Sequence, residues 1–472
     1  MSQERKHGPR CSMKIVHFLD SNFSKRSIPL IVFILFLTGC RQLAVDPEVQ
    51  LGLIVLTAII SFIVIFTKPI IGIYGVSIIS TIFSPSINLG FTNLYAHQWV
   101  ILIALLASIA SGLILENFHI RIKSELNLPI LVFVGSLLLS MGHAPNTIVG
   151  IKSFLYIGVL IASYYLVLLC VTSEKHIKTF IGLLVISTSA VCLISLGYHG
   201  SGRLASLVLR NPNSFGNFMA LVIPFFACLV YYGRLGKGKK LILSFSVILM
   251  SVSLVYTFSR SAWFGVLIGI LSLFVLRPKR SLLLLVCGVV IAVFLVSPIH
   301  KRIFEDISDP GAKYRIIKAR IAYEKFKEQP LLGNGLGSFH YEAQFSDIWA
   351  YRAHSTLENN YLLMLAEGGL IEFLAFVYLI IIFAKKALAL LRRVKDPFLY
   401  SVLLGAIASV ISTLAAGMFE DTLFFPKNNW LTGMFMGIVI VVGRIYEDSL
   451  RTANTEGVEA EGEKPTSSFG AP

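Results

Sequence analysis

Long apolar runs separated by short polar gaps dominate the chain between residues 28 and 446. Most runs hold about 15 to 22 residues, the length at which a helix crosses the hydrocarbon core of a bilayer. Alternating segments of about ten residues, which would indicate a transmembrane barrel, do not occur. The pattern predicts an all-α polytopic integral membrane protein with about 14 transmembrane helices, in a range of about 12 to 14. The expected spans are residues 28–45, 50–67, 69–84, 97–115, 128–142, 152–172, 180–198, 215–233, 241–258, 262–276, 281–298, 370–384, 398–417 and 427–444.

Basic residues are concentrated in every second gap between these spans. They are Arg5, Lys6, Arg10, Lys14, Lys25 and Arg26; Lys68; Arg121 and Lys123; Lys175 and Lys178; Arg234, Lys237, Lys239 and Lys240; Arg277, Lys279 and Arg280; and Lys385, Lys386, Arg392, Arg393 and Lys395. Because cytoplasmic loops carry an excess of lysine and arginine, this alternation predicts that these gaps and both chain ends are cytoplasmic. The other gaps, including a long one at 299–369, are expected on the outer side.

The predicted topology divides the chain into six segments. They are a cytoplasmic N-terminal segment (1–27), N-terminal transmembrane helices (28–151), a transmembrane core with outward arginine loops (152–298), a long extracytoplasmic loop (299–369), C-terminal transmembrane helices (370–446) and a cytoplasmic tail (447–472). The tail is acidic and rich in small residues, so we expect it to be disordered. The sequence "LTGC" at 37–40 fits either a lipoprotein cleavage site or an ordinary first span, and we favour the span.

Composition adds two points to this picture. A net charge of +15 would suggest nucleic-acid binding in a soluble protein, but here the charge bias of cytoplasmic loops accounts for it. The six cysteines are scattered, mostly inside apolar runs, and no CxxC motif or cysteine–histidine pair indicates a metal site. We therefore expect no metal, no cofactor and no nucleic-acid partner.

A few basic residues lie in the outward gaps, against the charge bias: Lys152, Arg203, Arg210 and Arg260. Each of them can be explained by snorkelling, in which the charged group reaches the lipid headgroups. That explanation is weakest for Arg260, which stands in the tight turn "FSRSAW" with a serine on either side. A guanidinium and two hydroxyls on a short turn form a candidate anion-binding corner.

The loop "HGSGRLASLVLRNPNSFGNF" (199–218) is a second candidate for anion binding. It offers Arg203 and Arg210, followed by a turn-forming Asn-Pro-Asn sequence just ahead of a span. The next helix then begins on the outer side, where its free N–H groups and positive dipole end favour an anion. An ordinary helix started by proline explains the same sequence, so both alternatives stay open.

The long outward segment contains a predicted helix, "DPGAKYRIIKARIAYEKFKEQP" (309–330), with Asp309 as its cap and Pro330 as its stop. Tyr314, Ile317 and Ile321 share one face and basic residues, among them Arg315, occupy the rest. We expect this helix to lie along the membrane surface over anionic headgroups. The glycine-rich "LLGNGLGSF" (331–339) lacks the frame of a nucleotide-binding loop, and we interpret it as a turn that folds the backbone toward the site.

The stretch "AHSTLENNYLLMLAEGGLIEF" (353–373) carries the most distinctive polar residues of the chain. On a helix, His354 and Glu358 would be i,i+4 neighbours, and the carboxylate could orient the imidazole of a general base. Metal binding is less expected, because there is no HExxH motif and no third ligand nearby. A surface histidine on an interfacial helix is the alternative, and the helical spacing alone favours it.

These motifs together resemble the O-antigen ligase and polymerase family of lipid-linked glycan transferases. The resemblance rests on "HSTLENNYLLMLAEGGLIEF", "PLLGNGLGSF", the "SRSAW" turn and the "R…NPN" loop, in the family's order, over about residues 152–443. Ser206 replaces a glycine of the family's Arg-x-x-Gly spacing, which leaves open whether Arg203 or Arg210 does the work of the family's arginine. Glu367 and Gly369 keep a Glu-x-Gly spacing, but Glu372 stands where a second glycine is expected.

The resemblance implies a fold similar to that of type C membrane glycosyltransferases. It also implies transfer of a glycan from an undecaprenyl-diphosphate carrier to an acceptor hydroxyl, on the periplasmic face of a bacterial inner membrane and without a metal. His354 would be the catalytic base with Glu358 beside it, while Lys152, Arg203, Arg210, Arg260 and Arg315 would bind the diphosphate. The implied partners are the lipid-linked donor, a lipid A core or growing glycan as acceptor, the bilayer and, for a polymerase, a chain-length regulator.

Three reactions of this family remain alternatives: ligation to lipid A core, polymerisation of O-antigen or exopolysaccharide repeats, and protein O-oligosaccharyl transfer. Outside enzymes, the alternative is a polysaccharide flippase or ion-coupled transporter with a similar number of spans. Transporters usually carry ionisable groups near the bilayer midplane, whereas here such residues, Lys152 and Glu372 included, lie at the ends of the predicted spans. This distribution favours chemistry at the outer edge of the membrane.

Overall fold

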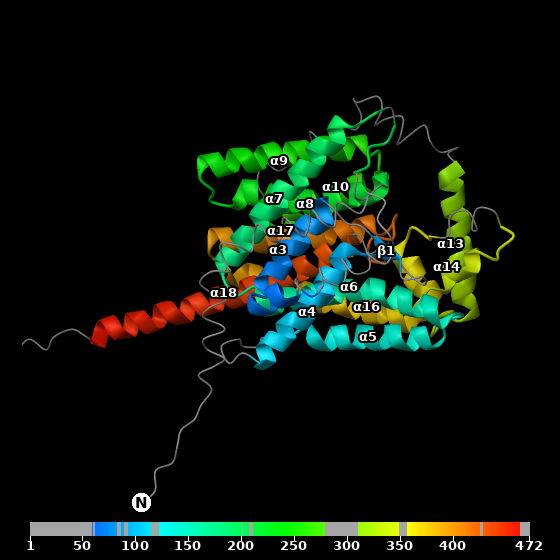
Figure 1. Cartoon of the computed structure of the whole chain (residues 1–472), viewed down its shortest axis with the longest axis horizontal. Coiled ribbons are helices and arrows are strands. Elements are labelled where there is room, and N and C mark those ends of the chain that lie inside the picture. The colour runs from blue at the N-terminus through cyan, green and yellow to red at the C-terminus, as the bar shows by residue number, and fades with distance from the viewer. Residues whose placement is uncertain are drawn as a thin grey trace, which may run out of the picture.

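The computed structural model describes residues 59, 62–82, 86–88, 93–114, 122–200, 202–206, 211–278, 310–348, 356–424 and 428–462. These residues form a bundle of helices with one short hairpin (Figure 1). The helices are α3 (Ile70–Ile82), α4 (Ala96–Ile114), α5 (Asn127–Gly142), α6 (Thr147–Cys170), α7 (Glu174–Gly197), α8 (Pro212–Tyr232), α9 (Lys237–Tyr256), α10 (Arg260–Leu276), α13 (Pro310–Glu328), α14 (Ser338–Ala343), α16 (Asn360–Arg393), α17 (Pro397–Ala416) and α18 (Asn429–Gly462). The hairpin pairs β1 (Ser86–Asn88) with β2 (Asn93–Tyr95) in antiparallel fashion.

The helices confirm a polytopic membrane protein. Within the described ranges, eight helices are long and apolar enough to cross a membrane, and α3, α5 and α10 are shorter apolar helices. Each of these coincides with one of the spans predicted from residue 69 onward. The predicted spans 28–45 and 281–298, and most of 50–67, lie outside the described residues, so the total of 14 stays a prediction.

Some boundaries differ from the prediction. α6 begins at Thr147 and not at 152, because the Asn146 side chain accepts hydrogen bonds from two N–H groups of the first turn and so caps the helix. The prediction of a disordered tail from residue 447 is wrong for 447–462, which continue α18 as a helix (Figure 1). No proline precedes Pro465 in this region, and its glutamate, alanine and arginine residues are compatible with a helix. The β1–β2 hairpin was not predicted from the sequence.

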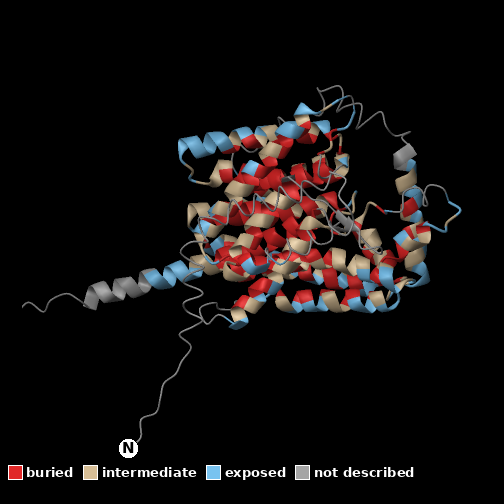
Figure 2. Cartoon of the chain, in the orientation of Figure 1, coloured by how far each residue is buried: buried red, intermediate tan, exposed pale blue. Residues whose placement is uncertain are grey.

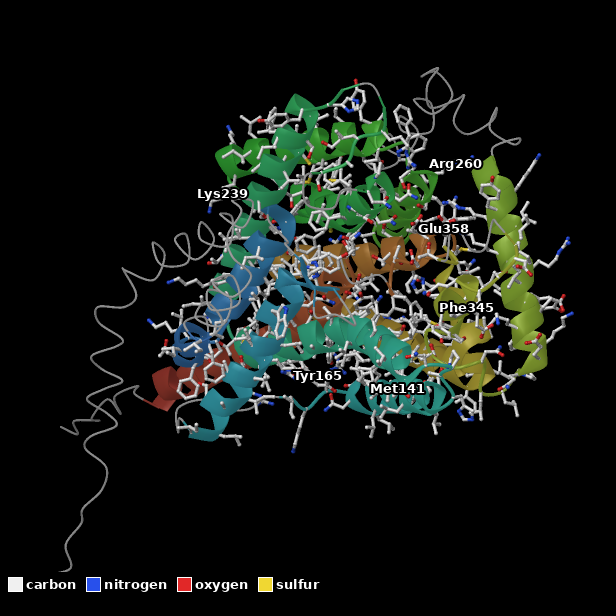
Figure 3. The ribbon with its side chains drawn as sticks, turned by 45° about the vertical axis from the view of Figure 1, so that its right-hand side comes forward. Met141, Tyr165, Lys239, Arg260, Phe345 and Glu358 are labelled. Carbon is white, nitrogen blue, oxygen red and sulfur yellow. The ribbon has the colours of Figure 1, made fainter. Side chains whose placement is uncertain are left out.

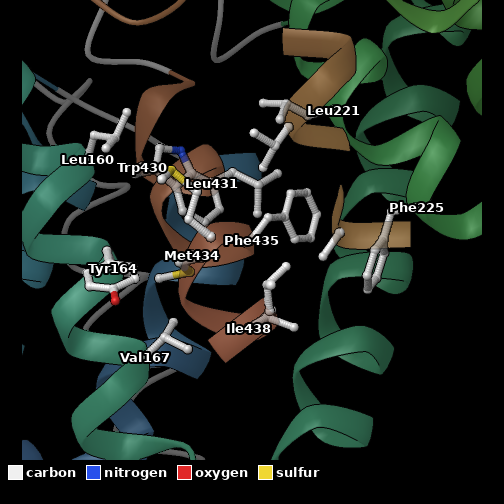
Figure 4. Packing of buried hydrophobic residues seen from close by; sticks show 14 of the residues in the cluster. Leu160, Tyr164, Val167, Leu221, Phe225, Trp430, Leu431, Met434, Phe435 and Ile438 are labelled. Atoms are coloured by element: carbon white, nitrogen blue, oxygen red, sulfur yellow. The ribbon is translucent and has the colours of Figure 1, made fainter. Parts of the chain in front are cut away.

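The centre of the bundle is formed by α8, α17 and the first part of α18 (429–443), whose residues are mostly buried (Figure 2). α8 packs against α9, α10 and α17, and α18 packs against α6 and α17. Figure 4 shows Trp430 and Phe435 of α18 between Tyr164 of α6 and Phe225 of α8, with the centroids of the Phe225 and Phe435 rings 4.8 Å apart. This dense apolar packing fixes the helix ends, and with them the polar loops.

Two glycines allow α18 and α6 to approach closely. A Cβ atom at Gly433 would lie 2.0 Å from the carbonyl oxygen of Leu160, and one at Gly437 would lie 2.8 Å from Cβ of Val167. The two glycines are four residues apart, a spacing that is common where membrane helices pack. The hydrophobic effect contributes little to helix association in lipid, so close van der Waals contact between the backbones stabilises the pair.

The loops gather at the two ends of the bundle, and which end is cytoplasmic stays a prediction from the charge alternation. At one end, the backbone N–H of Leu204, ahead of α8, donates a hydrogen bond to the carbonyl oxygen of Tyr256 at the end of α9. The backbone N–H of Asn360, at the start of α16, donates to the carbonyl oxygen of Gly417. At the other end, the guanidinium of Arg277 lies over the Tyr400 ring and Lys386 pairs with Glu125. Figure 3 shows Arg260 and Glu358 at the first end and Lys239 at the second. We call the first end the arginine end and the second the lysine end.

Candidate functional site

The glycine-rich turn at 331–337 folds back on α16, as the sequence predicts. Gly333, Gly335 and Gly337 have φ angles of 69°, 95° and 81°, which favour glycine. The turn brings the N–H groups of Gly337 and Phe339 to 2.8 and 3.1 Å from the buried Glu367 carboxylate. Glu367 therefore holds the start of α14 and has a structural role at the arginine end.

α16 is two helical pieces joined at Gly369, whose φ and ψ angles are 65° and −162°. Beyond this residue, the N–H groups of Leu370 and Ile371 bond to the carbonyl oxygens of Pro330 and Leu331 in the glycine-rich turn. The first piece therefore belongs to the segment predicted as the long loop 299–369, and it projects polar residues at the arginine end. The second piece is the predicted span.

The basic helix α13 also packs against the protein, while its position over lipid headgroups stays a prediction. Lys318, with 1% of its side chain exposed, points inward and donates to the Thr356 carbonyl oxygen at 2.7 Å. Arg315 donates from Nε to Glu358 at 2.8 Å, and Lys325 pairs with Glu342. A buried lysine is expensive unless it is paired and hydrogen-bonded, so these contacts hold α13 against the segment ahead of α16.

Glu358 is not part of a helix, which corrects the proposed i,i+4 relation with His354. Its φ angle is 59°, in the left-handed region that non-glycine residues rarely adopt, and α16 begins only at Asn360. The Asn359 side chain caps α16 by accepting from Tyr361 and Leu362 N–H groups. His354 itself lies outside the described residues, so its predicted role as a base stays a prediction.

The carboxylate of Glu358 binds two basic side chains of α13. Besides Arg315, it lies 3.2 Å from Nζ of Lys318. Burial works to raise its pKa, but the hydrogen bond and charge of Arg315 and the charge of Lys318 outweigh burial and hold that pKa below its ordinary value. Glu358 is therefore negatively charged at neutral pH and suited to fixing Arg315 and Lys318 in place.

A second carboxylate, Glu420 in the α17–α18 loop, connects α13 to α8. Its Oε2 atom lies 3.7 Å from Nη2 of Arg315 and accepts a hydrogen bond of 3.1 Å from the Asn213 amide. Burial, reinforced by Asp421 and Glu358, raises the pKa of Glu420, with Arg315 and Arg203 acting against it. The Asn213 side chain in turn accepts from Nη2 of Arg203, so one chain of contacts runs from Arg203 to Arg315.

Arg203 is fixed beside the Arg260 turn. Its Nε donates to the Thr257 carbonyl oxygen at 2.9 Å and Nη2 lies 3.4 Å from that of Phe258. Arg260 is the first residue of α10, two residues beyond Phe258. Ser259 and Ser261 are buried and their hydroxyl oxygens lie 3.2 Å apart, so they do not form the expected anion-binding corner with Arg260.

The remaining predicted cations are placed less favourably. Lys152 lies in the second turn of α6 with Nζ 5.8 Å from the centroid of the Tyr156 ring, and no described contact links it to the cluster. Arg210 lies outside the described residues. Asn211 caps α8 by accepting from the N–H groups of Asn213 and Ser214, so these two groups are already used and are not available to a phosphate.

Sequence reasoning missed three residues of this site: Lys318, Asn213 and Glu420. For Glu420 a signal existed, because "FEDTLFF" (419–425) puts two carboxylates in an outward gap, whereas the gaps near 85–96 and 143–151 carry no charged residue. For Lys318 no such signal exists, since only the packed structure shows which residues of a basic helix point inward. We define the arginine-end cluster as Arg203, Asn213, Arg260, Arg315, Lys318, Glu358 and Glu420.

The arginine-end cluster brings together basic side chains from the loop before α8, from α10 and from α13. Guanidinium groups bind phosphate oxygens in pairs of parallel hydrogen bonds, and fixed positive charge stabilises a leaving group on which negative charge grows. Within the described residues no group of three or more His, Cys, Asp or Glu could hold a metal ion. The geometry suits recognition of a phosphate or diphosphate.

Residues 245–377 match the protein-family model described as O-antigen ligase. The matched range begins in α9 and ends in α16, and it includes Arg260, α13, the glycine-rich turn and Glu358. No curated protein matches the chain. Within residues 245–377, the match supports the resemblance inferred from the sequence motifs, and the "R…NPN" loop lies outside the matched range.

Proposed function

We propose that this chain, a member of the O-antigen ligase and polymerase family through its residues 245–377, transfers a glycan from an undecaprenyl-diphosphate carrier to an acceptor hydroxyl. The reaction takes place at the arginine end of the bundle, on the outer face of a bacterial inner membrane. The product is either a glycan ligated to lipid A core or a longer O-antigen or exopolysaccharide chain. Both products need the same donor and the same chemistry.

The observation that supports this proposal most directly is the chain of contacts Arg203–Asn213–Glu420–Arg315. It links two arginines that lie more than a hundred residues apart in the sequence, beside the Arg260 turn. Because burial raises the pKa of Glu420, this carboxyl carries less negative charge near neutral pH and the basic side chains stay in excess. Such a site attracts a lipid-borne diphosphate and needs no metal to do so.

In the proposed reaction, the acceptor hydroxyl oxygen forms a bond to the anomeric carbon while the bond from that carbon to the diphosphate oxygen breaks. His354 takes the hydroxyl proton, and the carrier diphosphate leaves with the bonding electron pair. Arg203, Arg260 and Arg315 stabilise the charge that develops on the diphosphate. Attack on the face opposite the leaving group inverts the anomeric configuration.

The residues that follow His354 in the sequence are held by α13. Lys318 donates to the carbonyl oxygen of Thr356, two residues beyond His354, and Glu358 is held by Arg315 and Lys318. This arrangement supports Glu358 as a positioning residue, which replaces the direct Glu358–imidazole pair expected from a helix. A rigid anchor matters because a small displacement of a general base costs much of its rate.

A gene deletion followed by glycan profiling tests the function and separates its two forms. Loss of long chains on lipid A with polymer accumulating on the carrier indicates a ligase, whereas single repeat units left behind indicate a polymerase. His354→Ala is expected to abolish transfer by the purified protein without changing expression or membrane insertion, and His340→Ala, an exposed histidine of α14, serves as the control. Full activity of His354→Ala would remove the proposed base.

Two alternatives share some of these features. Protein O-oligosaccharyl transfer uses the same donor, and a modified protein in place of a modified lipid would identify it. A transporter is favoured by one observation, the Glu372 carboxyl, which is fully buried in α16 with no hydrogen-bond partner among the described residues. If Glu372→Gln stops movement of a lipid-linked glycan across the membrane and leaves glycan transfer by the purified protein intact, the transporter proposal replaces ours.

A further inference from the structure

At the lysine end of the bundle, an open pocket of about 410 Å³ lies between the segment ahead of α5, the second half of α16 and α18. Its charged lining consists of Lys123, Glu125, Lys386, Arg444 and Glu447. We propose that this pocket, which we call the lysine-end pocket, binds the headgroup of a phospholipid that carries one phosphodiester and a hydroxyl-bearing group, as phosphatidylglycerol does. The proposal does not depend on the glycan-transfer activity.

The walls of the pocket are held in place by contacts within the protein. Arg444 of α18 donates to the carbonyl oxygens of Lys123 and Leu168, at 2.5 and 3.5 Å. The Tyr164 hydroxyl donates to Oγ of Ser124 at 2.7 Å. These contacts tie the segment ahead of α5 to α6 and α18, so the pocket exists before a ligand arrives and little ordering entropy is lost on binding.

The charges of the pocket match a single phosphodiester. Three basic side chains, Lys123, Lys386 and Arg444, stand against two carboxylates, Glu125 and Glu447, which leaves one positive charge in excess. One phosphodiester carries one negative charge and neutralises this excess. The carboxylates can accept hydrogen bonds from the hydroxyl groups of the headgroup. A zwitterionic headgroup would bring an ammonium group as well and leave the positive excess in place.

Glu125 is the internal competitor of the phosphate. Its carboxylate lies 2.5 Å from Nζ of Lys386, but 62% of the Glu125 side chain is exposed, against 20% for Lys386. Exposed ion pairs of this kind are weak, so a phosphate can displace Glu125 into solvent at small cost. The displaced carboxylate then leaves Lys386, whose stem is packed in place, facing the ligand.

Exposed apolar side chains next to the pocket favour a lipid over a free phosphate. Leu128 and Leu131 of α5, which follows directly on Glu125, are 59% and 67% exposed, and Leu388 of α16 is 43% exposed. In a membrane these faces contact acyl chains, so a headgroup in the pocket would continue into chains along α5 and α16. The gaps at this end also carry the basic residues that the charge bias assigns to the cytoplasmic leaflet, where anionic lipids attract them.

The test uses the full chain in mild detergent, washed free of lipid and titrated with phosphatidylglycerol, with phosphatidylethanolamine or with inorganic phosphate. Native mass spectrometry counts the bound lipid, and thermal unfolding reports stabilisation. We expect phosphatidylglycerol to bind at least about tenfold more tightly than phosphatidylethanolamine, and inorganic phosphate to have no stabilising effect. The double variant Lys123→Ala/Lys386→Ala is expected to lose about tenfold or more of the phosphatidylglycerol affinity.

Two further variants guard against a loss caused by misfolding. Lys385→Ala removes an exposed lysine next to Lys386 that is not part of the pocket, and its affinity should be unchanged. Glu125→Gln removes the competitor of the phosphate and should increase affinity for phosphatidylglycerol. The proposal is overturned by equal binding of the two lipids, by unchanged affinity in the double variant, by a decrease in Glu125→Gln, or by equal stabilisation with inorganic phosphate alone.

The outcome is separable from the proposed function. The pocket lies at the end of the bundle opposite the arginine-end cluster, so the double variant should keep its ability to transfer glycan in detergent. A protein that binds phosphatidylglycerol as expected but transfers no glycan would contradict the proposed function and leave the lipid site standing. A protein that transfers glycan but does not bind phosphatidylglycerol would support the proposed function and contradict the lipid site.

Discussion

The guanidinium of Arg315 in α13 donates from Nε to the Glu358 carboxylate at 2.8 Å, which joins this basic helix to the residues just ahead of α16. Lys318, one turn further along α13, contacts the same carboxylate and the Thr356 carbonyl oxygen. These contacts place two basic side chains and one acidic side chain beside Thr356, which follows His354 by two residues in the sequence. The site is therefore positioned by α13 and not by the helix α16 alone.

The Lys318–Glu358 pair leads to an asymmetric prediction for stability. Lys318→Met removes the buried charge and keeps the length of the side chain, so the free energy of unfolding should change by only about 1 kcal/mol. Glu358→Gln leaves the Lys318 ammonium buried without its counter-charge, and should cost about 3 kcal/mol. Thermal unfolding in detergent measures both changes. Lys313→Met, at an exposed position on the same helix, is the control. If Lys318→Met and Glu358→Gln lower the free energy of unfolding equally, the Lys318 ammonium does not depend on Glu358 for its stability in the folded protein.

Activity should respond to Lys318→Met more strongly than stability does. Without the Lys318 ammonium, the Thr356 carbonyl oxygen loses its donor and the segment bearing His354 is held less firmly, so the turnover number should fall by about tenfold or more while the donor KM stays similar. Steady-state kinetics with a lipid-linked donor separates the two parameters. A rise in donor KM at unchanged turnover would instead make Lys318 a binding residue.

Arg260 and Arg203 should behave differently when replaced by alanine. Arg260→Ala is expected to raise the KM for the donor by about tenfold, because one charge-assisted contact to the diphosphate is lost, and to leave the acceptor KM unchanged. Arg203→Ala should also lower the unfolding temperature, since its guanidinium holds the carbonyl oxygens of Thr257 and Phe258. Arg320→Ala, an exposed arginine of α13, is the control. Equal losses toward donor and acceptor in Arg260→Ala would argue for a structural role.

Hydropathy predicted most of the membrane-spanning helices because each span can be recognised from its own residues, without knowledge of the rest of the fold. A run of apolar residues must be a helix in lipid, where every backbone N–H and C=O group needs a partner within its own segment, so the apolar helices appear where the runs are. The pattern failed at α6 and α16, where the helix extends beyond the apolar run. Asn146 caps α6 five residues early, and Gly369 lets α16 continue across a bend that a hydropathy window treats as a boundary.

The candidate site was predictable in its residue types but not in its connections. Arg203, Arg260 and Arg315 stood out because they lie in gaps that are predicted to face outward, where basic residues are disfavoured. Their partners did not, because Glu358, Asn213 and Glu420 are separated in sequence from the arginines that they contact by between 10 and 105 positions, and only folding brings them together. The helical spacing of His354 and Glu358 misled for a local reason, since the left-handed backbone of Glu358 ends any helix before α16 begins.

Glu420 should make stability depend on pH at the alkaline side. Burial raises its pKa to about 8 in the folded protein, with Asp421 and Glu358 adding to the shift and Arg315 and Arg203 opposing it. Since the folded state holds the proton more tightly than the unfolded state, its stabilisation is complete below the ordinary value of 4.5 and is lost as pH rises to about 8. Wild-type protein should therefore unfold a few degrees lower at alkaline than at weakly acidic pH.

Glu420→Gln carries a neutral amide at this position and should remove that alkaline loss, while Glu342→Gln, whose carboxylate pairs with Lys325 on the surface of the long segment, should keep it. Glu358 acts in the opposite sense: its pKa is lowered in the folded protein, so its contribution is lost as pH falls below the ordinary range. Unfolding midpoints across a pH series check both signs. An unchanged alkaline slope in Glu420→Gln would show that another group is responsible.

Gly369 should be the least replaceable glycine of α16. Its φ of 65° and ψ of −162° lie in a region that is essentially restricted to glycine, and an added Cβ atom would lie 2.4 Å from the carbonyl oxygen of Leu331. Gly369→Ala must therefore either strain the bend or push away the glycine-rich turn, and with it the hydrogen bonds from Leu370 and Ile371. We expect a cost of about 3 kcal/mol or more, and loss of transfer activity.

The matched control for this bend is Gly135→Ala on α5, the helix that packs against α16. A Cβ atom there meets nothing within 4 Å, so alanine should be neutral or slightly stabilising in a helix interior. Unfolding temperature and glycan transfer, measured side by side, distinguish the two positions. If Gly369→Ala is as stable and as active as Gly135→Ala, the bend in α16 is not required, and the arginine-end cluster must be positioned by α13 and the loops alone.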